Sequence, residues 1–179
     1  MNPSCNLFIV GPTGAGKTSI GRRLAEHYQL AFVDLDHEIE RHCGVPVSTV
    51  FELEGEAGFR RRESEMLDQW TGRQGIVLAT GAGAVLDPAN RRQLAARGYV
   101  LWLQAGIEQQ LERLARDTKR PLLAGEDRRA KLAAMREVRE PLYRELADLV
   151  LPDEHESVHS ATQRAIALID THWNRTRAA

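Results

Sequence analysis

Cysteine is scarce in this sequence. Among its 179 residues only Cys5 and Cys43 carry a thiol. Two cysteines this far apart form neither a disulfide framework nor the paired spacing of a zinc site. We therefore expect both to be buried thiols in a reducing compartment.

Neither sign of charge is in excess, and long apolar runs are missing. Lysine and arginine number 24, aspartate and glutamate number 25, and the formal net charge is −1. Such a chain has no overall field that attracts nucleic acid or an anionic membrane, so an anion site must be local. No apolar stretch approaches the roughly 20 residues of a membrane span, and the N-terminus lacks the order of a signal peptide. We expect a cytoplasmic monomer that binds small molecules, with no nucleic-acid or membrane partner.

The most informative stretch is Gly11-Pro12-Thr13-Gly14-Ala15-Gly16-Lys17-Thr18. It fits the phosphate-binding pattern G-x-x-x-x-G-K-[ST] and lies between an apolar run and a helix-like segment. Glycines let successive backbone N–H groups surround an anion, and the following helix adds the positive end of its dipole. In such a loop Lys17 reaches the β- and γ-phosphates of a nucleotide, and the Thr18 hydroxyl binds Mg²⁺. The alternative is a glycine-rich turn whose lysine is only solvated.

Apolar runs and helix-periodic stretches alternate along the chain. The apolar runs predict buried strands over 7–10, 31–33, 76–79, 100–103 and 149–151. Helix periodicity covers 19–28, 37–42, 47–70, 90–97, 107–116, 128–146 and 158–173. This order predicts a single domain, 1–179, of the α/β class, with three layers and a five-stranded parallel sheet. Ligands of such sheets bind beyond the carboxyl ends of the strands.

Three segments depart from simple alternation. The region 37–73 is too long for a plain crossover and predicts a helical insert that forms one wall of a pocket. The segment 117–127 has neither helical nor strand periodicity and predicts a mobile lid. Pro141 lies inside a helical run and should kink or divide that helix near Arg139.

Carboxylates and glycines follow the second and third strands. Asp34 and Asp36 are two apart on an extended segment, so their side chains point to the same side. One could face the Mg²⁺ shell and the other an acceptor hydroxyl. The alternative is that Asp36 only caps the next helix. The turn 81–83 could bring backbone N–H groups close to a ligand or provide only a tight turn.

Arginines mark the insert, the lid and the helix after the lid. Arg60 and Glu63 are three apart on a predicted helix, so the carboxylate can hold the guanidinium for an anionic ligand. A solvated surface ion pair is the alternative. Arg120 could close over a transferred phosphate or belong to a charged surface loop. Arg139 could point into the same pocket or pair with Glu140.

An ordered set of motifs therefore runs through the chain. It comprises Gly16-Lys17-Thr18, Val33-Asp34-Leu35-Asp36, Gly55-Glu56 through Phe59-Arg60 and Glu63, Gly81-x-Gly83, Arg120-Pro121-Leu122-Leu123 and Arg139-x-Pro141-Leu142-Tyr143. In this set the chain resembles the shikimate kinases from end to end. The resemblance implies a P-loop fold of the nucleoside-monophosphate-kinase type. It also implies ATP-dependent phosphorylation of the 3-hydroxyl of shikimate to shikimate 3-phosphate, on the route to chorismate and aromatic amino acids, with ATP as co-substrate and one Mg²⁺ per subunit.

The resemblance also implies roles for the matched residues. ATP would lie on Gly14, Ala15, Gly16, Lys17, Thr18, Ser19, Arg113 and Arg120, with Arg113 against the adenine. Mg²⁺ would bind Thr18 and, through water, Asp34. Shikimate would lie on Asp34, Asp36, Arg60, Glu63, Gly81, Ala82, Gly83 and Arg139. The implied catalytic residues are Lys17, Asp36 and Arg120. Asp36 would orient or deprotonate the 3-hydroxyl, and the two cations would offset the negative charge of the phosphates. The adenine-contacting loop of the family would lie near 152–157, where no motif matches securely, so its individual residues receive no assignment.

One position departs from the family. Family members commonly carry three consecutive glycines where this chain has Gly81-Ala82-Gly83. Alanine keeps the N–H group but disfavours positive φ. If the middle position needs positive φ, the affinity for shikimate should suffer; otherwise the change is nearly silent. We expect an active enzyme with at most modestly altered shikimate affinity.

Two other functions agree with parts of the pattern. A related small-metabolite kinase, such as one acting on gluconate, would use the same paired arginines for a carboxylate. A nucleotide-dependent switch that binds a protein would share the phosphate loop, but the chain lacks the N-K-x-D guanine signature. Turnover without any acceptor would favour the switch.

Overall fold

The computed structural model describes residues 4–115 and 127–174. The strands are β1 (Leu7–Val10), β2 (Ala31–Asp34), β3 (Ile76–Ala79), β4 (Tyr99–Leu103) and β5 (Leu149–Leu151). The α-helices are α1 (Lys17–Tyr28), α2 (Leu35–Cys43), α3 (Val47–Thr71), α4 (Pro88–Arg97), α5 (Ile107–Leu114), α6 (Arg128–Leu146) and α7 (Val158–His172), and a 3₁₀ helix, η1 (Ala84–Leu86), follows β3. Within these described ranges, none of the helices combines the length and the apolar character needed to cross a membrane.

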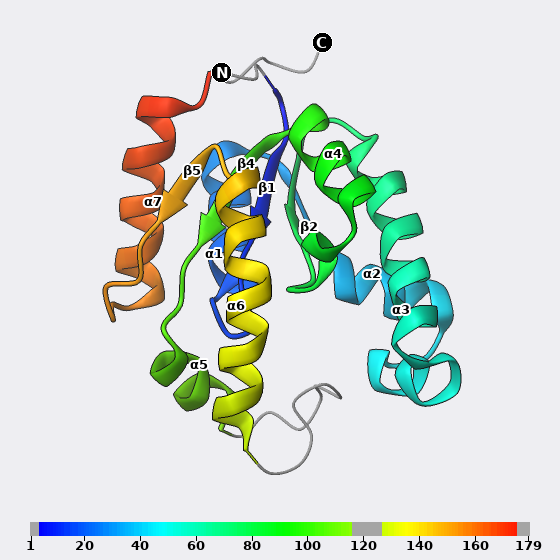
Figure 1. The fold of residues 1–179 in the computed structure, drawn as a ribbon. Helices are drawn as coiled ribbons and strands as arrows, with labels where there is room; N and C mark the ends of the chain where they lie inside the picture. Colours follow the sequence, from blue (N-terminus) through cyan, green and yellow to red (C-terminus); the bar gives the residue numbers. More distant parts are fainter. Residues whose placement is uncertain (1–3, 116–126, 175–179) are drawn as a thin grey trace.

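The strands form one parallel sheet in the order β2-β3-β1-β4-β5 (Figure 1). Strand β1 lies at the centre, where Leu7 is in register with Val77 of β3 on one side and with Tyr99 of β4 on the other. The second and third strands lie on one side of β1, and the fourth and fifth lie on the other, so the direction in which strands are added reverses at β1. A crevice is expected at the carboxyl end of β1 for this reason. The predicted fold class is confirmed.

Helices cover both faces of the sheet. Leu7 and Ile9 pack on the face that also carries residues of α1 and α7, whereas Phe8 and Val10 pack on the face that carries residues of α3, α4 and α6. Figure 1 shows α6 and α4 running across one face, with α2 and α3 to one side. Strands buried on both faces need apolar residues at every position, which is why continuous apolar runs mark them in the sequence.

Two helices differ from their sequence-based prediction. Helix α3 is broken at Gly55, whose φ of 67° and ψ of −177° are not helical. Helix α6, in contrast, continues through Pro141 to Leu146, so the predicted division near Arg139 is wrong. A proline removes one donor, to the carbonyl four residues earlier, which here belongs to the exposed Glu137. Water can replace the missing donor at that position.

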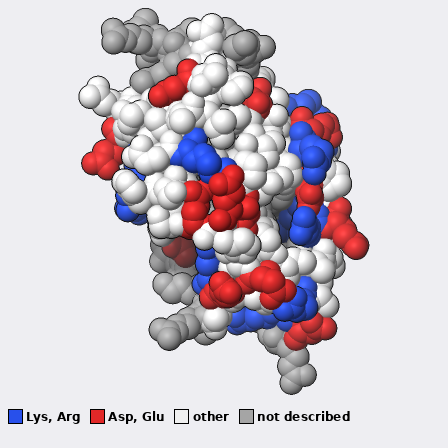
Figure 2. Space-filling view, turned by 90° about the vertical axis from the view of Figure 1, so that its left-hand side faces the viewer, with Lys and Arg blue, Asp and Glu red and all other residues white. Residues whose placement is uncertain are grey.

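The surface mixes charges of both signs. Figure 2 shows acidic and basic side chains lying next to each other on the face turned to the viewer. On α7, for example, Arg164 forms ion pairs with Glu154 at 3.1 Å and with Glu156 at 2.5 Å. Cys5 and Cys43 are free but only half-buried, which corrects the expectation of fully buried thiols.

Candidate active site

The loop between β1 and α1 leaves the first turn of α1 open to a ligand. Gly14 and Gly16 have φ values of 74° and 88°, in the left-handed region that side chains disfavour. Gly16 is the N-cap of α1, and it has no side chain that could accept hydrogen bonds from the first-turn N–H groups. These groups and the positive end of the helix dipole therefore remain available for an anion.

Lys17 lies folded over this loop. Its Nζ donates to the carbonyl oxygens of Gly11 and Pro12, both at 2.8 Å. The ammonium charge is thus held at the rim of the anion site. Ala15 is buried, and its backbone N–H donates to the carbonyl of Pro12 at 3.3 Å.

A hydroxyl and a carboxylate meet beside the loop. The Thr18 hydroxyl lies 2.7 Å from Oδ2 of Asp34, although the two residues belong to different elements. The other oxygen of Asp34, Oδ1, accepts from the backbone N–H of His37 at 3.3 Å and caps α2. The interpretation of Asp36 as the helix cap is therefore wrong, because α2 begins at Leu35 and Asp36 lies in its first turn.

Across the crevice, Arg60 of α3 is held by two carboxylates. Its Nη1 donates to Glu63 at 2.6 Å, and its Nη2 donates to Glu56 at 3.2 Å. The Glu63 side chain is 1% exposed and that of Arg60 is 23% exposed, so the first of these pairs is mostly buried and is not the solvated surface pair of the alternative interpretation. The guanidinium is therefore fixed in orientation.

The turn after β3 packs directly against these side chains. A Cβ atom at Gly81 would overlap the Glu63 carboxylate and lie 3.2 Å from Oδ1 of Asp36, and a Cβ atom at Gly83 would overlap the Arg60 guanidinium. The two glycines are thus required for close approach. Ala82 is not among the residues with positive φ, so its methyl group costs no backbone strain. Because the middle position of the turn does not need positive φ, we expect Ala82 in place of glycine to change the affinity for shikimate very little.

Burial raises the pKa of Glu63 to about 7. The opposing influence is the positive charge of Arg60, while the nearby Asp36 carboxylate raises the pKa further. Glu63 can therefore change its protonation state near neutral pH. Loss of its negative charge would remove the ionic part of its hold on Arg60.

Helix α6 adds a second arginine to this wall. Arg139 is 8% exposed, and its pKa is lowered by burial and also by the nearby charge of Arg60. One helical turn later, the Tyr143 hydroxyl donates to the carbonyl of Ala82 at 2.5 Å. Arg60 is half-buried and Arg139 is buried, and two such cations close together favour an anion between them. The sequence motif contained Tyr143 without a role for it, although its spacing of four from Arg139 places both on one face of the helix.

The phosphate loop, the start of α2, the turn after β3 and the end of α5 border a cavity of about 270 Å³ at the carboxyl end of β1. Its lining residues are Gly14, Gly16, Lys17, Thr18, Ser19, Asp34, Asp36, Thr80, Ala82, Arg113 and Leu114. Arg113 donates through Nη1 to the carbonyl of Gly14 at 2.8 Å, so it lies on the phosphate loop. Its contact with adenine stays a prediction. Thr80, to which the sequence analysis gave no role, directly follows β3 and borders the cavity. Arg120 and the segment 117–126 lie outside the described residues.

Comparison with known proteins gives one consistent family. A family model described as shikimate kinase matches residues 13–170. A shikimate kinase of Methylococcus capsulatus is 51% identical over 172 residues, which are 96% of each chain. The structure of a shikimate kinase from Acinetobacter baumannii in complex with shikimate has a TM-score of 0.91 at 43% identity and covers 95% of both chains. A gluconokinase from Sinorhizobium meliloti, with a TM-score of 0.61 and 15% identity, shares the fold alone.

Proposed function

Because the chain belongs to the shikimate kinase family, we propose that it transfers the γ-phosphate of ATP to the 3-hydroxyl of shikimate. One observation supports this most strongly: Asp36 lies between the phosphate loop and the wall that holds the half-buried Arg60 and the buried Arg139. Asp36 lines the cavity beside Lys17, and its Oδ1 lies close to Gly81 on the arginine side. An acceptor hydroxyl held at Asp36 would face the phosphate that is transferred.

ATP would place its phosphates on the first-turn N–H groups of α1, with Lys17 turning from its carbonyl partners to the β- and γ-phosphates. Thr18 and Asp34 would hold Mg²⁺. A hydroxyl and one carboxylate suit this ion, which keeps several waters and takes further oxygens from phosphates. When bound, Mg²⁺ neutralises charge on the β- and γ-phosphates.

The shikimate carboxylate would lie between Arg60 and Arg139, against the backbone of the turn 81–83. The two guanidiniums repel each other, and an anion between them relieves that repulsion. Glu63 would hold Arg60 in place before the substrate arrives. In this arrangement the ring of shikimate extends from the arginines toward Asp36.

Catalysis would then depend on positioning and electrostatics more than on covalent chemistry. Asp36 would accept a hydrogen bond from the 3-hydroxyl and orient it for in-line attack, which is worth a large part of the barrier. Lys17, with Arg120 from the segment 117–127 acting as a lid, would offset the charge on the transferred group. The region 37–73 would serve as the substrate-binding insert of a single cytoplasmic domain.

The role of Asp36 is tested by Asp36→Asn. The variant keeps the shape of the side chain but weakens its ability to accept a proton, so kcat should fall by at least about a hundredfold while the Kd of ATP changes little. Glu38→Gln is the matched control, because Glu38 lies on the same helix and its carboxylate pairs with the exposed Arg41 at 2.5 Å. Near-normal turnover of Asp36→Asn would exclude this role.

A further inference from the structure

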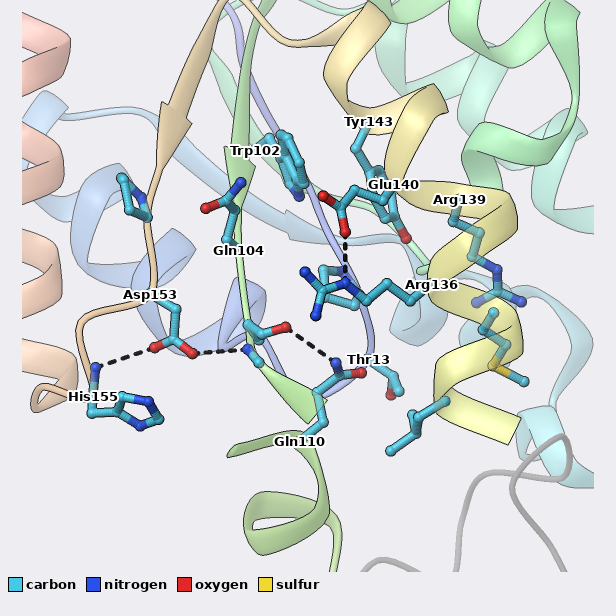
Figure 3. A pocket seen from close by; sticks show the side chains of 16 residues that line it. Thr13, Trp102, Gln104, Gln110, Arg136, Arg139, Glu140, Tyr143, Asp153 and His155 are labelled. Carbon is cyan, nitrogen blue, oxygen red and sulfur yellow. Dashed lines mark hydrogen bonds and ion pairs between the residues drawn. The ribbon is translucent and has the colours of Figure 1, made fainter. Parts of the chain in front are cut away.

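Arg139 and Tyr143 also line a second cavity, of about 290 Å³ (Figure 3). Its walls come from the ends of β4 and β5, from residues 12–13 of the phosphate loop and from residues 132–143 of α6. Apart from Arg139, none of its lining residues has an assigned role in the proposed reaction. Its position matters because two of its side chains also form the wall beside the turn 81–83.

One part of this cavity is apolar. The rings of Trp102 and Tyr143 are stacked, with centroids 5.9 Å apart and planes at 29°. Leu132 and Met135 of α6 and Pro152 after β5 add aliphatic surface. A cavity near 300 Å³ with such walls suits a small ring compound.

The polar part of the cavity offers donors that lack an acceptor. The Trp102 indole nitrogen and the Thr13 hydroxyl are buried, at 3% and 6% residue exposure, and neither has a hydrogen-bond partner within residues 4–115 and 127–174. Arg136 uses Nε to bind Glu140 at 2.6 Å, and Figure 3 shows its two terminal nitrogens pointing into the cavity. A buried donor without an acceptor is unfavourable, so the site is incomplete as it stands.

The acidic side chains of this cavity already have donors. Asp153 accepts from the backbone N–H groups of Gly106 at 2.8 Å and His155 at 3.2 Å, and from the side chain of Gln109 at 2.6 Å. Glu140 accepts from Arg136 and, at 3.0 Å, from Arg144. What remains for a ligand is therefore a set of donors beside apolar rings.

We propose that this cavity binds a small organic carboxylate with an apolar ring, as an effector of the substrate site. The carboxylate would accept from Arg136 and the Trp102 N–H, and the ring would lie against Tyr143, Leu132 and Met135. Binding would act on the turn 81–83 through the hydrogen bond from Tyr143 to Ala82. This coupling rests on the proposed function, whereas binding itself does not.

The test uses benzoate as the probe and benzamide, of nearly the same shape but without charge, as its control. The full chain, labelled with ¹⁵N at its tryptophans, is titrated with and without saturating shikimate and ADP, and Trp102→Phe assigns the indole signal. The Trp102 N–H should shift with a Kd of about 1 mM for a ligand of this size, while the signals of Trp70 and Trp173 stay in place. Benzamide should bind at least tenfold more weakly.

Arg136→Gln should weaken benzoate binding at least tenfold. Arg144→Gln is the matched control, because Arg144 also pairs with Glu140 but does not line this cavity. In steady-state kinetics, benzoate should change the KM for shikimate by at least twofold. The change should level off at high benzoate, with a half-maximal concentration equal to the Kd from the titration. Simple competition would instead raise the KM without limit.

Three results would overturn the proposal: no shift of the Trp102 N–H up to about ten times the expected Kd, equal binding to Arg136→Gln, or loss of the shift when shikimate is present. The last would mean that benzoate occupies only the substrate site. Should the protein fail to phosphorylate shikimate, the titration without substrates would still decide whether the cavity binds a carboxylate. The two failures are therefore distinguishable.

Discussion

Adding one carbon atom at Gly83 should separate the role of Arg60 from the stability of the fold. A Cβ atom at this position would overlap the Arg60 guanidinium, which must then move away from the crevice. The backbone itself accepts alanine, because φ at Gly83 is −97° and lies outside the left-handed region. The group that yields is the end of a flexible side chain, so the folded structure should persist.

The expected magnitude follows from what Arg60 would lose. A charge-assisted hydrogen bond contributes about 1.5–3 kcal/mol, and its loss corresponds to a rise of about 10- to 150-fold in the KM for shikimate. The KM for ATP should stay within about twofold, since the phosphate loop is not touched. The melting temperature should change by only a few degrees.

Ala82→Gly is the matched control at the neighbouring position. It removes one carbon where the backbone does not need glycine, so the KM for shikimate should change by less than about threefold. Both variants are measured by initial rates of ADP release at varied shikimate, with calorimetric melting alongside. An unchanged KM in Gly83→Ala would refute the placement of the carboxylate at Arg60, and a tenfold improvement in Ala82→Gly would refute the argument from φ.

Three further predictions concern the wall around Arg60. The pKa of Glu63 is near 7, so its carboxylate becomes protonated as pH falls from 8 to 6 and loses its ionic hold on Arg60. The KM for shikimate should then rise by up to about tenfold. Glu63→Gln should abolish this pH dependence. The same raised pKa means that the folded state binds an extra proton between about pH 4.5 and 7. The free energy of unfolding should therefore fall as pH rises through 7, and it should fall less in Glu63→Gln. Equal pH slopes of the two proteins in chemical denaturation would contradict this. Tyr143→Phe keeps the ring stack on Trp102 but loses the hydrogen bond to Ala82. The KM for shikimate should therefore rise about fivefold, with kcat nearly unchanged. An unaltered KM would show that Tyr143 does not hold the turn 81–83 in place for the substrate.

Most of the fold was predictable from local sequence patterns. The strands were predictable because a parallel strand covered on both faces must be apolar throughout. The phosphate loop was predictable because its glycines and its lysine lie at fixed positions within one short segment. The break at Gly55 was not predictable, since a single glycine is tolerated inside many helices. The continuity of α6 through Pro141 depends on an exposed carbonyl, which the sequence does not reveal.

The site was predictable only where its parts are close in sequence. Arg60 and Glu63 share a helix face by spacing alone. The contact of Thr18 with Asp34 and that of Tyr143 with Ala82, in contrast, join residues 16 and 61 positions apart, so they exist only once the sheet and α6 are assembled. The alternative in which Asp36 only caps α2 is wrong by two positions, because helix ends are the least certain feature of a sequence-based prediction.

The central claim is tested most directly by ADP release from Mg-ATP with shikimate, with gluconate and without any acceptor. We expect release that depends strictly on shikimate, accompanied by equimolar shikimate 3-phosphate identified by NMR. Equal release without an acceptor, or release with gluconate alone, would contradict the assignment of the arginine wall to shikimate and leave only the phosphate loop standing.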